Sequence, residues 1–232
     1  MITRERVKDP KRRILITCVQ MFIEKGFKAT TMLDIIREAD VSSGTFQNIF
    51  KTKDGVLFEL VDFMFKSQFE MARGLSEKQL SPVCVYAVET AIQLAVTECN
   101  ENLREIYVEA YTQPKLSEYI YQKTSTELNE IFGAYNPDWQ ESDFYESDIG
   151  TAGMMRAFMA RPCDKYFTLK RKTQKFLKMS FNAYNVPNGE QEKAFNLLSS
   201  MDITKTANSV LNKLFAALEM TYDFKFNENF NN

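Results

Sequence analysis

GFKATTMLDIIREADVSSGTFQNIFKTKDGVL, residues 26–57, is the stretch that decides the fold of this chain. Thr31 is a residue type that caps helix N-termini, and Asp34 follows it at the spacing of a capping box. Apolar residues then recur at helical spacing until the pattern breaks. Ser42 can cap a second helix that ends near Phe50. The stretch predicts two short helices joined by a tight turn, which is the layout of a helix-turn-helix.

A helix-turn-helix binds DNA in a defined way, because its first helix crosses the DNA backbone and its second helix enters the major groove by its N-terminal end. The second helix here offers hydroxyl and amide side chains, which are Ser43, Thr45, Gln47 and Asn48. Such groups hydrogen-bond base edges or phosphates, and amides pair well with adenine. The sequence therefore predicts binding to double-stranded DNA.

The same stretch resembles the N-terminal DNA-binding domain of TetR-family transcriptional regulators, over roughly residues 10 to 60. The agreeing positions are Gly26, Phe27, Thr30, Thr31, Ile35, Ala39, Val41, Ser42, Gly44, Thr45, Phe46, Phe50, Lys53 and Asp54. The chain departs from the family pattern at Gln47, where a tyrosine that touches a phosphate is usual, and at Ile49, where a polar or aromatic residue is common. These departures leave the phosphate contacts of the second helix open.

The resemblance implies that Thr30, Thr31 and Lys53 lie against the DNA backbone, with Lys53 near a phosphate. The residues expected to contact DNA are Thr30, Thr31, Ser42, Ser43, Thr45, Phe46, Gln47, Asn48 and Lys53.

Glycine (8) and proline (6) are scarce in the 232 residues, which argues against a turn-rich all-β fold. We predict an all-α protein: a three-helix helix-turn-helix head joined by a long connector helix to a larger helical-bundle body. The expected domains are a DNA-binding domain, 1–52, and a ligand-sensing and dimerisation domain, 53–232, whose residues 53–73 form the connector. Further helices are expected at 10–25, 81–99, 103–111, 114–132, 149–160, 164–184 and 202–220, and an acidic surface loop or turn at 136–148.

Charge is unevenly distributed: residues 1–55 carry a net charge of +4 and the remainder −6. A basic head on an acidic body fits nucleic-acid contact confined to the head. A basic N-terminal segment holds Arg4, Arg6, Lys8, Lys11, Arg12 and Arg13. It is either a solubilising arm or an arm that reaches the DNA, and the sequence leaves both open.

The chain lacks the residues and motifs that several classes of enzyme and metal-binding protein require. The chain has no histidine, its four cysteines form no CxxC pair, and it contains neither GxxxxGK[ST] nor GxGxxG. We therefore expect no enzyme activity, no cofactor, no metal site, and buried reduced cysteines. No signal-peptide pattern and no long apolar run are present, so the expected location is the cytoplasm, without membrane contact.

The resemblance also implies a small-molecule pocket in the body and a homodimer. The expected mostly apolar pocket would be lined by Tyr107, Tyr111, Met155, Phe158 and Met159, although each can equally be plain core. Glu98, Glu109 and Glu118 are expected to face solvent, with countering a cationic ligand as the alternative, and the basic run 170–178 is expected to be a solvated face. The apolar stripe of the last helix, expected to pair across a two-fold axis, is Val210, Leu211, Leu214, Phe215 and Leu218.

These expectations combine into a transcriptional regulator, most often a repressor in that family, that a small apolar effector releases from a palindromic operator. The alternative is a helical DNA-organising protein with the same head and no ligand-sensing role.

Overall fold

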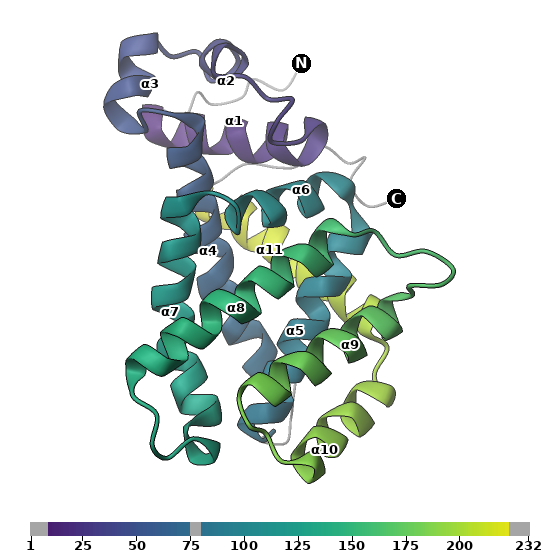
Figure 1. The fold of residues 1–232 in the computed structure, drawn as a ribbon. Helices are drawn as coiled ribbons and strands as arrows, with labels where there is room; N and C mark the ends of the chain where they lie inside the picture. The colour runs from purple at the N-terminus through teal and green to yellow at the C-terminus, as the bar shows by residue number, and fades with distance from the viewer. Residues whose placement is uncertain (1–8, 75–79, 223–232) are drawn as a thin grey trace.

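The structure is a computed structural model that describes residues 9–74 and 80–222, without the side chains of 65–74 and 221–222. Its described residues are helical and contain no strand, so the protein is all-α as predicted (Figure 1). The elements are α1 (Pro10–Lys25), α2 (Met32–Glu38), α3 (Ser43–Ile49), α4 (Lys53–Gly74), α5 (Pro82–Cys99), α6 (Glu101–Ala110), α7 (Pro114–Phe132), a 3-10 turn (Gly133–Tyr135), α8 (Glu141–Ala160), α9 (Leu169–Ala183), α10 (Asn188–Ser199) and α11 (Ile203–Tyr222).

Helices α1, α2 and α3 form a compact unit, which we call the head. The carboxylate of Asp9 accepts a hydrogen bond from the Lys11 amide at 3.1 Å and starts α1. Gly26 ends α1 at φ 89°, a conformation that favours glycine. The core of the head contains the fully buried rings of Phe22 and Phe46.

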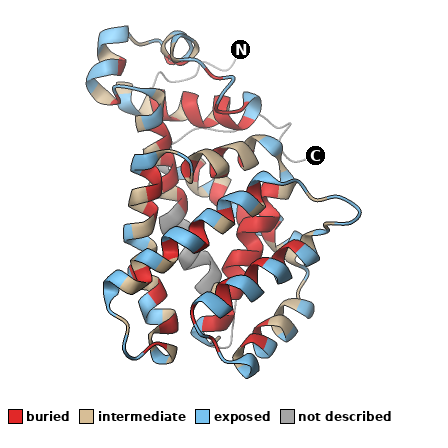
Figure 2. Cartoon of the chain, viewed as in Figure 1, coloured by how far each residue is buried: buried red, intermediate tan, exposed pale blue. Residues whose placement is uncertain are grey.

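Helix α4 leaves the head and runs down the length of the molecule into the remaining helices, α5 to α11, which we call the body (Figure 1). Its buried side chains in the described part are Val56, Leu57, Leu60, Val61 and Met64. The side chains of α4 after Met64 lie outside the described part. Helix α5 lies at the centre of the body and is buried along most of its length (Figure 2). Among the described residues, no helix combines the length and apolarity that crossing a membrane requires.

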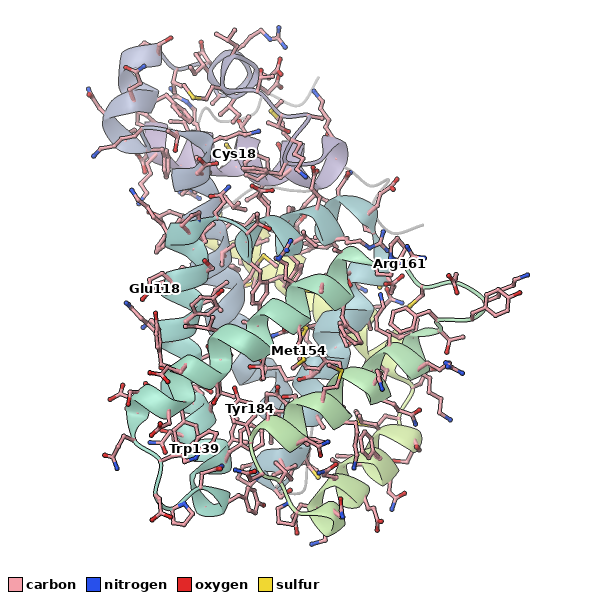
Figure 3. All side chains as sticks on the ribbon, in the orientation of Figure 1. Cys18, Glu118, Trp139, Met154, Arg161 and Tyr184 are labelled. Atoms are coloured by element: carbon pink, nitrogen blue, oxygen red, sulfur yellow. The ribbon has the colours of Figure 1, made fainter. Side chains whose placement is uncertain are left out.

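Helix α8 begins earlier than expected, because the acidic stretch 136–148 is not simply a loop. Gln140 and Asp143 form a capping box at its start, and acidic side chains in a first helical turn are favoured by the helix dipole. Trp139 holds the segment before α8 in place. Its ring packs edge-on against those of Phe144 and Tyr184, with ring centres 5.1 Å and 6.3 Å apart (Figure 3). The prediction of a surface loop up to residue 148 was therefore wrong.

The run 170–178 is not a uniformly solvated face, because Lys172 is fully buried. Its ammonium donates to Glu98 Oε1 at 2.5 Å and to the carbonyl oxygen of Arg161. Glu98 also pairs with Arg104 at 3.2 Å, so the expectation that Glu98 faces solvent was wrong. Burial alone would raise the pKa of Glu98, but the hydrogen bonds from Lys172 and from the backbone amide of Cys163 bring it below its ordinary value.

The apolar stripe of α11 packs inside a single chain, against α5, α4 and α1. The side chains of Val210, Leu211, Leu214 and Leu218 are all buried without any second copy. These four residues cannot form a dimer interface while they fill the core, so that assignment was wrong for them. Phe215 is half-buried against the same core.

Candidate functional site

The outer side of α3 is polar and accessible. Ser43, Gln47 and Asn48 are exposed, while Phe46 and Phe50 on the opposite side are buried in the head. Ser42 caps the helix, since its Oγ accepts the Thr45 amide at 3.0 Å. The amide side chains of Gln47 and Asn48 therefore project from a short helix whose orientation is fixed by the core beneath it.

The N-terminus of α2 is held by a capping box. Thr31 Oγ1 accepts the Asp34 amide at 3.1 Å and donates to Asp34 Oδ2 at 2.6 Å. These bonds from Thr31, helped by the charge of Arg37, hold the pKa of Asp34 below its ordinary value. Thr31 is exposed, and so is Leu33, which is 76% exposed and was not among the residues expected to contact DNA.

Two residues expected to contact DNA are inside the head instead. Thr30 is fully buried, and its hydroxyl donates to the carbonyl oxygen of Gly26 at 2.8 Å. Phe46 is fully buried as well, with its ring 6.2 Å from that of Phe50. Neither side chain can reach DNA without leaving the core, so both assignments were wrong.

Lys53 also stabilises the head through bonds to the backbone. Its ammonium donates to the carbonyl oxygens of Phe27 at 2.8 Å and Thr30 at 3.0 Å, and lies 4.3 Å from the centre of the Phe27 ring. Two of its three donors are therefore used to hold the loop between α1 and α2 against α4. Only the remaining donor is left for a phosphate.

Lys51, which was not among the residues expected to contact DNA, is an exposed cation close to the end of α3. It comes directly after Phe50, the C-cap of α3, and adopts the left-handed region at φ 61°. Lys51 and Lys53 are only two residues apart, so their positions in the sequence do not show which of the two has a free ammonium group.

The basic N-terminal segment lies partly outside the described residues, which begin after Arg4, Arg6 and Lys8. Lys11 pairs with Glu59 of α4 at 2.8 Å. Arg13 donates to the carbonyl oxygens of Ala39 and Asp40, each at 2.9 Å, and so braces the turn between α2 and α3. The described part of the segment therefore stabilises the head.

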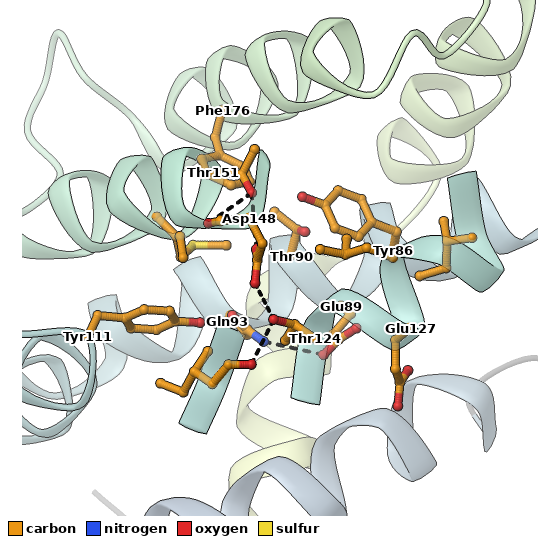
Figure 4. A pocket seen from close by; sticks show the side chains of 15 residues that line it. Tyr86, Glu89, Thr90, Gln93, Tyr111, Thr124, Glu127, Asp148, Thr151 and Phe176 are labelled. Atoms are coloured by element: carbon orange, nitrogen blue, oxygen red, sulfur yellow. Dashed lines mark hydrogen bonds between the residues drawn. The ribbon is translucent and has the colours of Figure 1, made fainter. Parts of the chain in front are cut away.

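A cavity of about 60 Å³ lies in the body between α5, α7, α8 and α9 (Figure 4). It is lined by Tyr86, Glu89, Thr90, Gln93, Tyr111, Ile120, Thr124, Glu127, Leu128, Ile131, Asp148, Thr151, Ala152, Met155 and Phe176. Tyr111 and Met155 were expected there. Glu89 and Asp148, both buried, were not, so the wall is more polar than predicted.

Three other residues expected to line a pocket lie elsewhere. Tyr107 borders a separate void of about 10 Å³ beside α4. Met159 is fully buried core, and the ring of Phe158 lies 5.7 Å from that of Phe176 and 5.9 Å from that of Phe167. Phe158 and Met159 therefore fill space rather than enclose it.

Asp148 is held by two hydroxyl groups. Thr124 donates to its Oδ2, and Thr151 donates to its Oδ1 at 3.1 Å. Burial raises the pKa of Asp148 to about 6, and the two hydroxyl bonds only partly oppose that rise. Burial also raises the pKa of Tyr111 well above its ordinary value.

A larger hollow of about 410 Å³ lies between α9, α10 and the start of α11. Its apolar lining is half-buried: Leu169, Phe195, Leu198, Met201 and Ile203. No buried charge lies in its wall. Within the described part of the chain, no group of three or more acidic or cysteine side chains is placed to hold a metal ion.

Helix α6 connects the cavity to the head. At its start, the Asn102 side-chain amide donates to the carbonyl oxygen of Ile23 in α1 at 2.8 Å. Just after its end, Gln113 Nε2 donates to Asp54 Oδ1 of α4 at 3.0 Å. Tyr111, which lines the cavity, lies between these two ties.

The similarities to known proteins cover only part of the chain. Residues 14–60 match the sequence model of the family described as "Bacterial regulatory proteins, tetR family". The chain is 25% identical over 99 residues to the "Uncharacterized HTH-type transcriptional regulator YuxN" of Bacillus subtilis (strain 168), a match that covers 43% of this chain and 32% of that protein. No solved structure matches the chain significantly.

Two further relatives show the same pattern. "Uncharacterized HTH-type transcriptional regulator YerO" of Bacillus subtilis (strain 168) is 30% identical over 71 residues, which are 31% of this chain and 25% of that protein. "HTH-type transcriptional regulator HbdR" of Aromatoleum sp. (strain CIB) is 38% identical over 52 residues, 22% of this chain and 23% of that protein. The matched segments span a third or less of each relative's length. Residues 14–60, which lie in the head and the start of α4, are therefore similar to the tetR family of bacterial regulatory proteins.

Proposed function

We propose that the protein is a transcriptional regulator that binds double-stranded DNA through α3 and lets a small molecule in the body control that binding. The observation that carries the proposal is the exposed polar side of α3, where Gln47 and Asn48 project from a helix locked by buried Phe46. We infer a non-enzymatic role in the cytoplasm, where chromosomal DNA lies.

The proposed DNA contacts divide into two kinds. Gln47 and Asn48 read base edges in the major groove, since a carboxamide can bond adenine bidentately. Ser43 and the exposed Thr31 contact the backbone, and Lys51 supplies a phosphate contact. Lys53 contributes mainly by holding the head together.

Control by a ligand is supported by the body cavity and by α6. A ligand alters DNA affinity only if it binds two states of the protein with different affinity. A molecule that moves Tyr111 also moves α6, whose Asn102 and neighbouring Gln113 bond α1 and α4. The cavity favours this sensor over a DNA-organising protein that has no ligand.

We infer a homodimer and repression by release from a palindromic operator. Two heads related by a two-fold axis would contact half-sites about 34–36 Å apart. Because the stripe of α11 is buried within one chain, the two copies must meet through another surface.

The test is selection of genomic fragments by the full-length protein at about 0.15 M salt, a concentration at which non-specific binding is weak. A shared inverted-repeat sequence among the retained fragments is expected. Enrichment no greater than that of the Gln47→Ala/Asn48→Ala variant would overturn the proposal.

A further inference from the structure

The cavity in the body has a chemical bias in its wall. Among its described lining residues are the carboxyl-bearing side chains Glu89, Glu127 and Asp148, and no lysine or arginine. Asp148 is only 6% exposed, and Figure 4 shows its carboxylate directed toward Thr124 across the cavity from Tyr111. A buried carboxylate is costly unless opposite charge or several donors compensate it.

The donors that Asp148 receives are shared with other acceptors. Thr124 has a single hydroxyl proton, and its Oγ1 also lies within 2.8 Å of the carbonyl oxygen of Ile120. The Thr151 hydroxyl also lies 3.5 Å from the backbone carbonyl oxygen of Asp148 and 2.9 Å from the hydroxyl of Tyr184, a bond in which either hydroxyl can donate. Each threonine hydroxyl therefore has a second acceptor within hydrogen-bond distance besides the carboxylate.

Each oxygen of Asp148 has one hydroxyl partner, although an ionised carboxylate can accept about four hydrogen bonds. Both partners are neutral. The acceptor capacity that remains on the carboxylate suits a charged donor that carries several N–H groups.

The remaining residues that line the cavity suit the uncharged, apolar part of such a ligand. Ile120, Leu128, Met155 and Phe176 supply apolar surface, and the rings of Tyr86 and Tyr111 add aromatic faces that attract cations. At ~10–15 Å³ for each water-sized group, the cavity of about 60 Å³ holds roughly four to six non-hydrogen atoms.

We propose that this cavity binds a small protonated alkylamine, with its ammonium group on the carboxylate of Asp148 and its alkyl chain against Ile120, Met155 and Phe176. The regulatory consequence, a change in DNA affinity transmitted through Tyr111 and α6, rests on the function proposed above. The binding itself does not.

Titration provides an independent readout. The raised pKa of Asp148 means that the carboxylate becomes protonated near pH 6 and then no longer attracts an ammonium group. Amine affinity should therefore fall as the pH falls through this range. The elements packed around Asp148 each contribute other titratable groups. These are Tyr86 and Glu89 of α5, Tyr111 after α6, Glu127 of α7 and Tyr184 after α9.

The experiment compares three ligands of nearly equal size on the full-length protein by calorimetry: propylamine, 1-propanol and propionate. Propylamine should bind more tightly than 1-propanol by about tenfold, the factor expected for a charge-assisted hydrogen bond, and propionate should not bind. The preference for propylamine should shrink as the pH is lowered from 7.5 to 5.5.

Asp148→Asn removes the charge and keeps the shape. It should weaken propylamine by about tenfold and leave 1-propanol unchanged. The matched control is Glu146→Gln, which changes the net charge equally at an exposed position of the same helix and should bind like the unmodified protein. Should D148N fail to fold, the comparison of ligands and the pH series on the unmodified protein decide the matter.

Equal affinity for propylamine and 1-propanol in the unmodified protein, or unchanged propylamine binding in folded D148N, would overturn the inference. DNA binding by the ligand-free protein is measured in parallel. If DNA is bound without an amine preference, only the amine site is refuted. If the amine binds but DNA does not, the site stands and the regulatory function is refuted.

Discussion

The side-chain amide of Asn102 donates a hydrogen bond to the carbonyl oxygen of Ile23 at 2.8 Å, and this bond joins α6 of the body to the last turn of α1. Gly26 permits the close approach, since a Cβ there would lie 3.0 Å from Asn102 Oδ1 and 2.5 Å from Glu105 Oε2. The head is therefore attached to the body at a second place besides the continuous helix α4.

Asn102→Ala should lower the free energy of unfolding by about 1 kcal/mol, because it removes the donor and leaves a half-buried carbonyl at the end of α1 without it. Urea denaturation measures this change. Asn212→Ala, an exposed asparagine on α11, is the matched control and should stay within about 0.5 kcal/mol of the unmodified protein. Equal stability of the two variants would show that the Asn102 bond does not stabilise the attachment.

Substitutions on the exposed side of α3 should affect DNA recognition, whereas substitutions on its buried side should affect stability. Gln47→Ala and Asn48→Ala should reduce discrimination between DNA sequences by about 1–3 kcal/mol each, while stability changes by less than about 0.5 kcal/mol. Phe46→Ala should instead destabilise the protein by about 3–5 kcal/mol, because it empties the core of the head. Fluorescence anisotropy with labelled DNA and urea denaturation separate the two effects. A stable Phe46→Ala protein would contradict the packing described.

Substitutions of Lys51, just before α4, and of Lys53, the first residue of α4, should also affect different properties. Lys53→Ala should cost about 1–3 kcal/mol of stability, since it releases two backbone carbonyl oxygens. Lys51→Ala should leave stability unchanged and reduce the slope of log affinity against log salt by about 0.9, the loss of one phosphate contact. The exposed Lys28→Ala is the control for stability. The reverse assignment of effects would restore Lys53 as the main phosphate contact.

The helix-turn-helix was predictable because its information is local. The capping box of Thr31 and Asp34 and the cap at Ser42 are spaced within one helical turn, and both are present. The burial of Thr30 was not predictable, because Thr30 and Thr31 are adjacent residues of the same type that differ only in their three-dimensional surroundings.

Interactions between distant residues explain the other failures. Lys172 is buried because Glu98, 74 residues earlier, receives its ammonium. An amphipathic stripe such as that of α11 is the same whether it packs within a chain or between chains, so periodicity cannot tell the two apart. The polar cavity depends on Thr124 and Asp148, which lie on different helices.

Stability should depend on pH through Asp148. Its pKa is raised by burial to about 6, so between the unfolded and folded pKa the folded protein binds a proton that the unfolded chain does not. Lowering the pH from 7.5 to 4.5 should therefore stabilise the unmodified protein relative to Asp148→Asn by about 2 kcal/mol. Urea denaturation of both proteins across this range measures the difference, in which shifts of other groups cancel. Parallel pH profiles would show that Asp148 titrates normally.

The central claim, that α3 reads DNA sequence, is tested most directly by the ratio of the protein's affinities for its selected genomic site and for unrelated DNA at about 0.15 M salt. The selected site should bind at least about 1,000-fold more tightly, and Gln47→Ala/Asn48→Ala should remove most of this preference while the protein stays folded. Equal affinity for both DNAs, or a preference that survives the double substitution, would contradict it.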